Sequence, residues 1–516
     1  MSRKNLRNNF SKEIVVGVDV VDISEDGRGI GKKEGEVFFI KGAVPGEKLT
    51  IEVYGKKKSV KEAKILNIET SSPHRVDPFC KYFGECGGCK WQHLAYKSQL
   101  EFKEKQILDA LTRIGKIDST YLMDIWNPIL PSLETKYYRN KLEFTFSHRR
   151  WKTASEITKS ESNEFPLPPK PDVLDFEPPT SQKRDDGENL NSDASKITYS
   201  AGLGFHIPGS FDKILDIEYC FLQKEPSNLI RNAIKEFCIK INSSFFNLRS
   251  QSGLMRNLLI RTASTGELMV IVVFAFSEPE TIQKLMNYIL QSFPEINSLQ
   301  YIINSKQNDT LHDREVILFS GVDHIKEKME NLVFRISAKS FYQTNSEQAY
   351  QLYNLVRKIA DFKGDELVYD LYTGTGTIAN FIADKVQKVI GLEYVDDAVL
   401  DAKKNAEFNQ ISNVEFFTGD IKNLLSESFT KIHGFPDTII TDPPRAGMHP
   451  EVVEAILKIE AKKLIYISCN PATQARDILM LNEKYELINV FPVDMFPHTQ
   501  HVENIVLLGL RSREVN

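Results

Sequence analysis

The chain lacks the features that mark membrane and secreted proteins. No run of about 18 apolar residues occurs in its 516 residues, so we expect no segment that spans a membrane. The basic start, MSRKNLRNNFSK, has no apolar core behind it and is not expected to be a signal peptide. Cysteine is scarce, with six residues in all, which excludes a disulfide-stabilised scaffold. Together these absences predict a cytoplasmic protein.

Size and charge indicate several domains with different partners. A chain of 58.9 kDa with 41% hydrophobic residues exceeds one ordinary domain and can form more than one core. The net charge of −5 is uneven, because residues 1–100 hold 18 Lys and Arg against 13 Asp and Glu and the remainder is acidic. A basic front part favours a polyanionic partner, although a solvated charged face has the same composition.

The first 70 residues predict a small β-barrel. Short segments of alternating apolar and polar residues, such as EIVVGVDVVDI and KLTIEVYG, are separated by Gly- and Asp-rich turns over residues 11–70. Such even spacing favours a five-stranded barrel of the OB type. The unit resembles a TRAM domain, an RNA-binding module of RNA-modifying enzymes. A row of lysines gives it a basic edge suited to an oligonucleotide backbone: Lys56, Lys57, Lys58, Lys61 and Lys64.

Half of the cysteines fall within ten residues, as Cys80-x5-Cys86-x2-Cys89, which indicates a metal site. A tetrahedral or cubane site needs a fourth ligand, and Cys220 in IEYCFLQ is the best candidate. Structural zinc prefers two short Cys pairs, whereas three near cysteines and a remote one suit an iron–sulfur cluster. We therefore favour a [4Fe–4S] cluster, with zinc or unconnected thiols as the alternatives.

The middle of the chain predicts a helix followed by an α+β domain. Residues 94–115 have helical apolar spacing and end at Gly115. Residues 116–340 contain strand patterns, including a hairpin at 257–274, and predict a mostly antiparallel α+β domain. Residues 151–198 are rich in Pro, Ser and acids and predict a surface insertion.

From Glu366 onward, strand and helix patterns alternate. The strand segments are ELVYDLYT, KVIGLEY, VEFFTG, DTIITDPP, KLIYISC, ELINVFPVD and VENIVLLGL, with helical stretches between most of them. This order predicts a doubly wound, largely parallel α/β sheet. In such a sheet, the chemistry is expected beyond the carboxyl ends of the strands.

The first of these strands ends in a glycine-rich segment, DLYTGTGT, with glycines that let the backbone approach a nucleoside. Glu393, at the end of the second strand, is placed to hold ribose hydroxyls. Because Gly374-x-Gly376-x-x-Ala379 also satisfies a loose dinucleotide fingerprint, a nicotinamide cofactor and S-adenosylmethionine compete at this point.

Two later motifs supply candidate catalytic groups. In TDPPR, the prolines stiffen a turn that fixes the Asp442 carboxylate over the sheet edge. Cys469 in ISCNP ends a buried strand and would be a strong nucleophile if its pKa were lowered, although a lone Cys is more often buried and inert. In HTQHVE, His498, His501 and Glu503 could form a metal site, but a general base at Glu503 is favoured.

Taken together, FYQTN, DLYTGTGT, DPPR, SCNP, HTQHVE, the cysteine cluster and the barrel resemble the RNA 5-methyluridine methyltransferase family over nearly the whole chain. The best-fitting subgroup has a TRAM domain and an iron–sulfur cluster and acts on 23S ribosomal RNA. The resemblance implies that Cys469 is the nucleophile and Glu503 the base. It places the cluster on Cys80, Cys86, Cys89 and Cys220. It places S-adenosylmethionine on Gln343, Tyr372, Thr377, Glu393, Asp420 and Asp442.

The expected organisation is a TRAM-like RNA-binding barrel (1–72), a cysteine segment with a helix (73–115), a central α+β domain (116–340) and a class I S-adenosylmethionine-dependent methyltransferase domain (341–516). The expected reaction is methyl transfer to C5 of a uridine in RNA by a protein that is favoured to be a monomer. Ribosomal RNA is preferred over transfer RNA by resemblance alone. An amino-group methyltransferase, a nicotinamide-dependent oxidoreductase with a cluster and a non-catalytic RNA-binding module are the alternatives.

Overall fold

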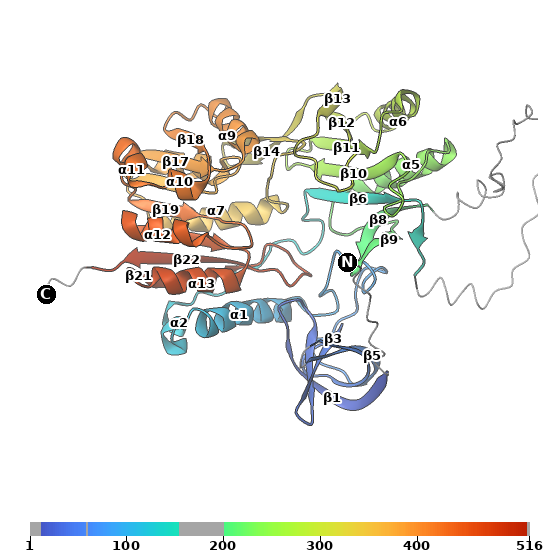
Figure 1. Cartoon of the computed structure of the whole chain (residues 1–516), viewed down its shortest axis with the longest axis horizontal. Helices are drawn as coiled ribbons and strands as arrows, with labels where there is room; N and C mark the ends of the chain where they lie inside the picture. Colours follow the sequence, from blue (N-terminus) through green and yellow to red (C-terminus); the bar gives the residue numbers. More distant parts are fainter. Residues whose placement is uncertain (1–11, 58–59, 154–200, 513–516) are drawn as a thin grey trace, which may run out of the picture.

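The computed structural model describes residues 12–57, 60–153 and 201–512 (Figure 1). The expected insertion at 151–198 lies outside the described residues from residue 154 onward, as does Lys58 of the expected basic edge.

Five N-terminal strands close into a barrel, drawn at the bottom of Figure 1. They are β1 (Glu13–Ile23), β2 (Gly29–Lys33), β3 (Glu36–Lys41), β4 (Lys48–Lys57) and β5 (Val60–Thr70), in the order β1-β2-β3-β5-β4. Every second side chain points inward, because successive residues of a strand face opposite sides. The buried interior includes Val18, Phe38, Ile40, Leu49 and Ile51. The predicted five-stranded barrel of the OB type is confirmed.

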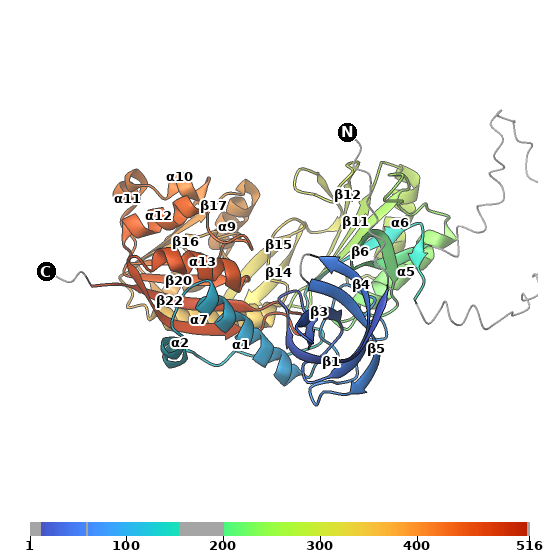
Figure 2. The same cartoon turned by 60° about the horizontal axis from the view of Figure 1, so that its bottom comes forward.

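The helix predicted at 94–115 is α1 (Tyr96–Arg113). It lies between the barrel and the C-terminal sheet, beside α13 (Pro471–Leu481), in both Figure 1 and Figure 2. The next helix, α2 (Ser119–Ile125), packs on β21 (Tyr485–Val493), and Trp126 and Leu130 bridge to that strand. Residues 119–130 therefore pack on the C-terminal sheet, although the sequence grouped them with the central domain.

A mostly antiparallel sheet of eight strands forms the centre of the chain. Its order is β13-β12-β11-β10-β6-β8-β9-β7. The strands are β6 (Lys141–Ser147), β7 (Arg150–Trp151), β8 (Gly202–Ile207), β9 (Ser210–Asp216), β10 (Met255–Thr262), β11 (Leu268–Phe274), β12 (Ser298–Ile303) and β13 (Val316–Gly321). Two helices, α5 (Ser227–Lys240) and α6 (Pro279–Ser292), contribute to its buried core. The predicted hairpin is β10 and β11.

A short hairpin and a helix connect this sheet to the C-terminal one. Strands β14 (His324–Met329) and β15 (Leu332–Ser337) form a two-stranded sheet of their own. Asn345 caps the start of helix α7 (Ser346–Ala360), because its side chain accepts a hydrogen bond from the backbone N–H of Gln348.

The C-terminal sheet contains all seven strands that the sequence predicts. They are β16 (Leu367–Leu371), β17 (Lys388–Glu393), β18 (Val414–Thr418), β19 (Thr438–Thr441), β20 (Lys463–Ser468), β21 and β22 (Glu503–Leu510). The order is β18-β17-β16-β19-β20-β22-β21, parallel except for β22, which is antiparallel to both neighbours. The doubly wound α/β prediction is confirmed for this sheet.

Helices cover both faces of the C-terminal sheet. They are α7, α8 (Thr377–Ile382), α9 (Asp396–Phe408), α10 (Ile421–Leu424), α11 (Glu427–His433), α12 (Pro450–Ile459) and α13. Successive residues of β16 show the two faces, because Val368 belongs to a core with α7, α8 and α9, and Tyr369 to a core with α12 and α13. Strands buried on both faces are mostly apolar, as the inner strands are here, and Asp370 of β16 is a buried exception.

Within the described residues, no helix is both long and apolar enough to cross a membrane.

Candidate active site

Cys469 lies at the carboxyl edge of the C-terminal sheet, directly after β20. Ser468 pairs with Asn504 of the antiparallel neighbour β22, so Cys469 and Glu503 lie at the same end of adjacent strands. Asn470 caps α13 by accepting a hydrogen bond from the N–H of Ala472, at 3.1 Å. Cys469 is only partly buried, so its thiol is open to a substrate.

A cavity of about 150 Å³ opens at Cys469 and is formed by distant parts of the chain. Its walls come from the β1–β2 turn of the barrel, from α1 and from the loops that follow β19, β20 and β21. The lining residues are Glu25, Gln106, Arg445, Cys469, Asn470, Pro471, Gln500, His501 and Val502. The barrel and the sheet therefore meet at the candidate nucleophile.

Arg445, the last residue of the DPPR motif, is a site residue that was not among the predicted ones. The side chains of Asn470 and Thr473 hold its carbonyl oxygen at 3.0 and 3.2 Å, which ties the loop after β19 to the start of α13. Its side chain lines the cavity beside Cys469. The sequence signal that could have identified Arg445 is its position, a cationic residue directly after the Asp-Pro-Pro that follows a strand.

Three carboxyl groups lie near one another at the strand ends beneath the cavity. Asp370 is the fourth residue of β16, Asp442 directly follows β19 and Glu503 begins β22. Burial raises the pKa of Asp370 and of Asp442 to about 7 each. Burial, with the nearby Asp442 charge, raises the pKa of Glu503 well above its usual range. Asp370 is a buried acid that the sequence analysis did not select.

The electrostatics around Cys469 differ from the condition set by the sequence analysis, which required a lowered thiol pKa. Burial first, and then the charges of Glu503 and Asp442, raise the pKa of Cys469 to about 11. The Arg445 guanidinium acts in the opposite direction, through its charge and a hydrogen bond. In the ligand-free protein the thiol is therefore protonated at neutral pH.

The glycine-rich segment and its neighbours form a cradle at the ends of β16 and β17. The Glu393 carboxylate accepts hydrogen bonds from the backbone N–H groups of Gly374, Tyr394 and Val395, at 2.9 to 3.0 Å. Gly376 has φ +72, and a Cβ there would lie 2.8 Å from the Phe416 ring. This position requires glycine for both backbone and packing reasons.

The other predicted cofactor residues surround the same cradle. Tyr372 directly follows β16, and Asp442 directly follows β19. Asp420 lies two residues after the end of β18. Thr377 begins α8 and is buried. The segment with Gln343 is linked to it, because the Thr375 hydroxyl donates to the Phe341 carbonyl at 3.3 Å. The structure thus brings five of the predicted residues to the ends of neighbouring strands at one edge of the sheet and links the Gln343 segment to the same loop.

The four predicted cluster cysteines surround a second cavity, of about 30 Å³. Cys80, Cys86 and Cys89 approach from the segment before α1, and Cys220 from the loop after β9. The remaining lining has no carboxylate or histidine and includes Tyr82, Phe83, Gln92, Phe205, Ile217 and Leu222. Burial raises the pKa of Cys86 and of Cys89 to about 12 each, and neighbouring thiols add to both shifts.

This arrangement brings the thiols together without forming a ready metal site. In the part of the chain that the structure describes, no group of three or more His, Cys, Asp or Glu side chains is arranged to hold a metal ion. The same finding applies to the metal site considered for His498, His501 and Glu503. His498 is buried, and its carbonyl oxygen accepts hydrogen bonds from the N–H groups of Lys90 and Trp91.

The expected basic edge of the barrel is weaker than its lysine count indicates. Lys61 forms ion pairs with Glu36 at 2.7 Å and with Glu13 at 3.2 Å. Lys64 forms one with Glu52 at 3.3 Å. Lys56 is exposed. Carboxylates on neighbouring strands, which the charge count could not place, thus neutralise part of the edge.

The fold and the cradle define a class. A seven-stranded α/β sheet with one antiparallel strand and a glycine-containing loop after its first strand, β16, is an S-adenosylmethionine-dependent methyltransferase fold. The structure matches that of the Pyrococcus abyssi tRNA (uracil-54, C5)-methyltransferase in complex with S-adenosyl-L-homocysteine, with a TM-score of 0.68 and 25% identity. The match covers 96% of this chain and 100% of that one.

Sequence comparison gives the family. A family model described as tRNA (Uracil-5-)-methyltransferase matches residues 298–511. A Bacteroides thetaiotaomicron protein described as an uncharacterized RNA methyltransferase is 50% identical over 492 residues, 95% of this chain and 100% of the relative. A Chlorobaculum tepidum protein with a similar description is 34% identical over 502 residues, 96% of each chain. The chain belongs to the tRNA (uracil-5-)-methyltransferase family and is an S-adenosylmethionine-dependent RNA methyltransferase.

Proposed function

We propose that this enzyme methylates C5 of a uridine in RNA through a covalent adduct between Cys469 and C6 of the uracil. The observation that carries the proposal is the open cavity at Cys469, which has a thiol at its wall and the buried Glu503 on the adjacent strand. An amino-group methyltransferase needs no thiol, and that alternative leaves this arrangement unexplained.

The target is a uridine of large-subunit ribosomal RNA in this proposal, on the strength of the cysteine segment and the barrel. A transfer RNA is the second candidate, because the matching family model and the P. abyssi enzyme carry tRNA in their names. In either case the base must leave its stack to reach the thiol at the cavity wall. The barrel, which we infer to be a TRAM-type module, supplies contacts to phosphates. Its β1–β2 turn, which reaches the cavity, brings it close to the target nucleotide.

S-adenosylmethionine supplies an electrophilic methyl group and a positive charge when bound, and it would be held by Gln343, Tyr372, Thr377, Glu393, Asp420 and Asp442. Uracil C5 is a poor nucleophile by itself, so the chain must first activate it. Cys469 loses its proton to solvent, and its sulfur then forms a bond to C6. The C5–C6 π electrons move into an enolate that is nucleophilic at C5. The Arg445 cation favours the thiolate that starts this sequence.

C5 bonds to the methyl carbon as the bond from that carbon to the donor sulfur breaks. The Glu503 carboxylate then removes the proton from C5, the C5–C6 double bond re-forms and the bond from sulfur to C6 breaks, which returns the thiolate. Burial, together with the Asp442 charge, raises the pKa of Glu503, so this group must first lose its own proton, and its carboxylate is then a stronger base than an ordinary one. Asp442, at the end of the strand between β16 and β20, is placed to orient the uracil or the donor.

We further infer that Cys80, Cys86, Cys89 and Cys220 hold a [4Fe–4S] cluster. The donor set supports this, because four thiols converge on a mainly apolar cavity whose lining has no carboxylate or imidazole. Backbone and amide donors also face the sulfurs, with the N–H of Gly88 at 3.4 Å from Cys86 Sγ. The cluster lies apart from the Cys469 cavity, so a structural role fits it better than redox chemistry.

The cluster is tested by iron and sulfide analysis and the visible spectrum of protein purified without oxygen. We expect about four irons in the wild type and loss of the absorption in Cys89→Ala. Cys238→Ala is the matched control, because Cys238 is buried in α5 outside the cavity. Zinc in place of iron in the anaerobic protein would contradict the assignment.

The reaction is tested by mapping 5-methyluridine in ribosomal and transfer RNA from cells with and without the gene. With purified protein, we expect Cys469→Ala to abolish methyl transfer while retaining RNA binding, and Glu503→Gln to accumulate a covalent RNA adduct. Cys238→Ala again serves as the control. Methyl transfer that survives in Cys469→Ala would reject the adduct and favour an amino-group acceptor.

A further inference from the structure

The loop between β21 and β22, residues 494–502, forms one wall of the Cys469 cavity. Its ends are fixed by the sheet, because Val493 pairs with Glu503. Between these ends the chain leaves the sheet and places Gln500, His501 and Val502 at the cavity. The sheet alone does not determine the path of this excursion, so other contacts must hold it.

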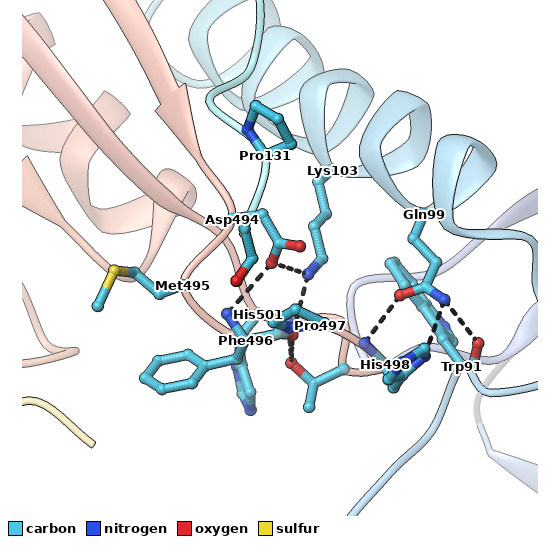
Figure 3. Close-up of polar contacts among 12 residues, drawn as sticks. Trp91, Gln99, Lys103, Pro131, Asp494, Met495, Phe496, Pro497, His498 and His501 are labelled. Atoms are coloured by element: carbon cyan, nitrogen blue, oxygen red, sulfur yellow. Dashed lines mark hydrogen bonds and ion pairs between the residues drawn. The ribbon is translucent and has the colours of Figure 1, made fainter. Parts of the chain in front are cut away.

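A buried ion pair from α1 holds the start of the loop (Figure 3). Lys103 Nζ lies 2.6 Å from Asp494 Oδ1, and both side chains have 0% exposure. The same ammonium donates to the Phe496 carbonyl at 3.1 Å, and the Tyr96 hydroxyl donates to Asp494 Oδ2 at 2.8 Å. Asp494 in turn accepts from the N–H of Phe496, at 3.1 Å. A charge buried this fully is retained only when it is paired and hydrogen-bonded.

One turn earlier on α1, Gln99 holds the middle of the loop. Its side-chain oxygen accepts from the N–H of His498 at 2.8 Å, and its amide nitrogen lies 3.2 Å from His498 Nδ1 (Figure 3). The His498 carbonyl accepts from the N–H groups of Lys90 and Trp91, at 2.9 and 3.0 Å. His498 has φ +62, a left-handed conformation that is uncommon for a non-glycine residue, and its contacts with Gln99, Lys90 and Trp91 support it.

These contacts join three segments that are far apart in the sequence. Lys90 and Trp91, just after the three clustered cysteines, contact the loop through their N–H groups. Helix α1 contacts it through Gln99 and Lys103, and the loop itself forms the cavity wall. From this geometry we propose that Lys103 and Gln99 are positioning residues of the active site, which hold the 494–502 loop so that it receives the target base beside Cys469. Neither residue lines the cavity, so both act through the loop. That the cavity receives a target base rests on the proposed function. That Lys103 and Gln99 hold the 494–502 loop, an arrangement we call the clamp, does not depend on it.

The test uses two variants of the full-length enzyme. Lys103→Met/Asp494→Asn removes both charges together and leaves no unpaired buried ion, which a single substitution would do. Gln99→Met keeps the shape of the side chain and loses its contacts to His498, together with its hydrogen bonds to the Trp91 and Leu94 carbonyls. It provides a second test if the double variant does not fold. Arg256→Met is the matched control. It removes a buried cation that holds a different loop, through the carbonyls of Asn304, Lys306 and Asn308.

The first readout is covalent trapping on transcripts of large-subunit ribosomal RNA and of a tRNA pool in which 5-fluorouridine replaces uridine. Fluorine at C5 cannot be removed as a proton, so the adduct persists on a denaturing gel. We expect adduct formation to slow at least tenfold in both variants, while the affinity for S-adenosylhomocysteine, measured by calorimetry, stays within twofold. Adduct formation within twofold of the wild type, or a parallel loss of S-adenosylhomocysteine affinity, would overturn the positioning role.

The second readout needs no RNA and so separates this proposal from the proposed function. Release of the wall should increase the rate at which iodoacetamide alkylates Cys469 at least threefold in both variants and leave it unchanged in Arg256→Met. An alkylation rate of Cys469 that is unchanged in both variants would contradict the proposal that Lys103 and Gln99 hold the loop. If the wild type forms no adduct with either RNA, the covalent mechanism fails, and the alkylation rates still decide the clamp.

Discussion

The titration of Cys469 in the ligand-free enzyme follows directly from the surroundings of its thiol. Burial and the charges of Glu503 and Asp442 raise its pKa to about 11, and Arg445 opposes them only in part. Since only the thiolate reacts with iodoacetamide, the alkylation rate should follow the ionised fraction. At pH 8 that fraction is on the order of one in a thousand for a pKa of about 11.

The expected pH dependence is large enough to separate this thiol from an ordinary one. Between pH 7 and pH 10 the thiolate fraction rises about 900-fold for a pKa of about 11. For an unperturbed cysteine with a pKa of about 8.5, the same interval gives a rise of roughly 30-fold. Glu503→Gln removes the negative charge that Glu503 carries once it is ionised, and burial raises the pKa of Glu503 well above its usual range. At pH values where Glu503 has lost its proton, we therefore expect the thiol pKa of the variant to be lower and its alkylation to be faster, by up to about tenfold.

Arg445→Met should change the alkylation rate of Cys469 in the direction opposite to Glu503→Gln. It removes the cation that favours the thiolate, so alkylation at pH 8 should slow, but only by a factor of about two to five, because Arg445 is exposed and its charge is screened. The assay is peptide mapping by mass spectrometry after timed alkylation, with circular dichroism to show that the protein stays folded at each pH. Buried Cys238 is the internal reference for unfolding. A rate that levels off below pH 8 would refute the reasoning.

Three further predictions concern stability, the cofactor cradle and the barrel. Burial raises the pKa of Asp370 to about 7, so the free energy of unfolding should fall as the pH rises from about 4 to 7. Asp370→Asn should remove at most about 3 kcal/mol of the fall between pH 5 and pH 8, measured by urea titration. Equal pH dependence in both proteins would contradict this prediction. Gly374→Ala has nothing within 4 Å of the added Cβ and should cost only about 1–2 kcal/mol of backbone strain. Gly376→Ala adds to a similar strain a clash of its Cβ with Phe416, so it should destabilise the protein by about 2–5 kcal/mol and weaken S-adenosylhomocysteine binding. Equal effects of the two substitutions in calorimetry would refute the packing argument. Lys61→Ala should change RNA affinity less than twofold, because two carboxylates already neutralise Lys61. The salt dependence of RNA binding, measured by filter binding, should also stay the same. A smaller salt dependence in the variant would show that Lys61 contacts phosphate.

Much of the fold was predictable because its signals are local. The barrel strands alternate apolar and polar residues, and the seven C-terminal strands are short apolar runs that end at turn residues. The position of residues 119–130 was not predictable, since α2 carries no signal for the strand that it contacts. The bridges from Trp126 and Leu130 to β21 link segments more than 350 residues apart.

The candidate site divides in the same way. Motifs at strand ends selected Cys469, Asp442 and Glu393, because parallel strands bring their carboxyl ends to one edge. Glu503 reaches the same edge because it begins the antiparallel strand β22. Arg445 and Asp370 were missed because each gains its importance from burial or from a neighbour on another strand. The direction of the thiol pKa was also outside the reach of sequence, since it depends on how many charges surround the sulfur and how deeply it is buried.

The sequence by itself determined which residues can do chemistry and which strands carry them, because those properties follow from side-chain type and from local periodicity. Only the tertiary structure decided what surrounds the thiol. It placed a turn of the barrel at the cavity, paired Lys61 with carboxylates and set a buried lysine of α1 against the loop that forms the cavity wall. Such contacts join residues by distance and burial, and neither quantity is written in the order of residues along the chain.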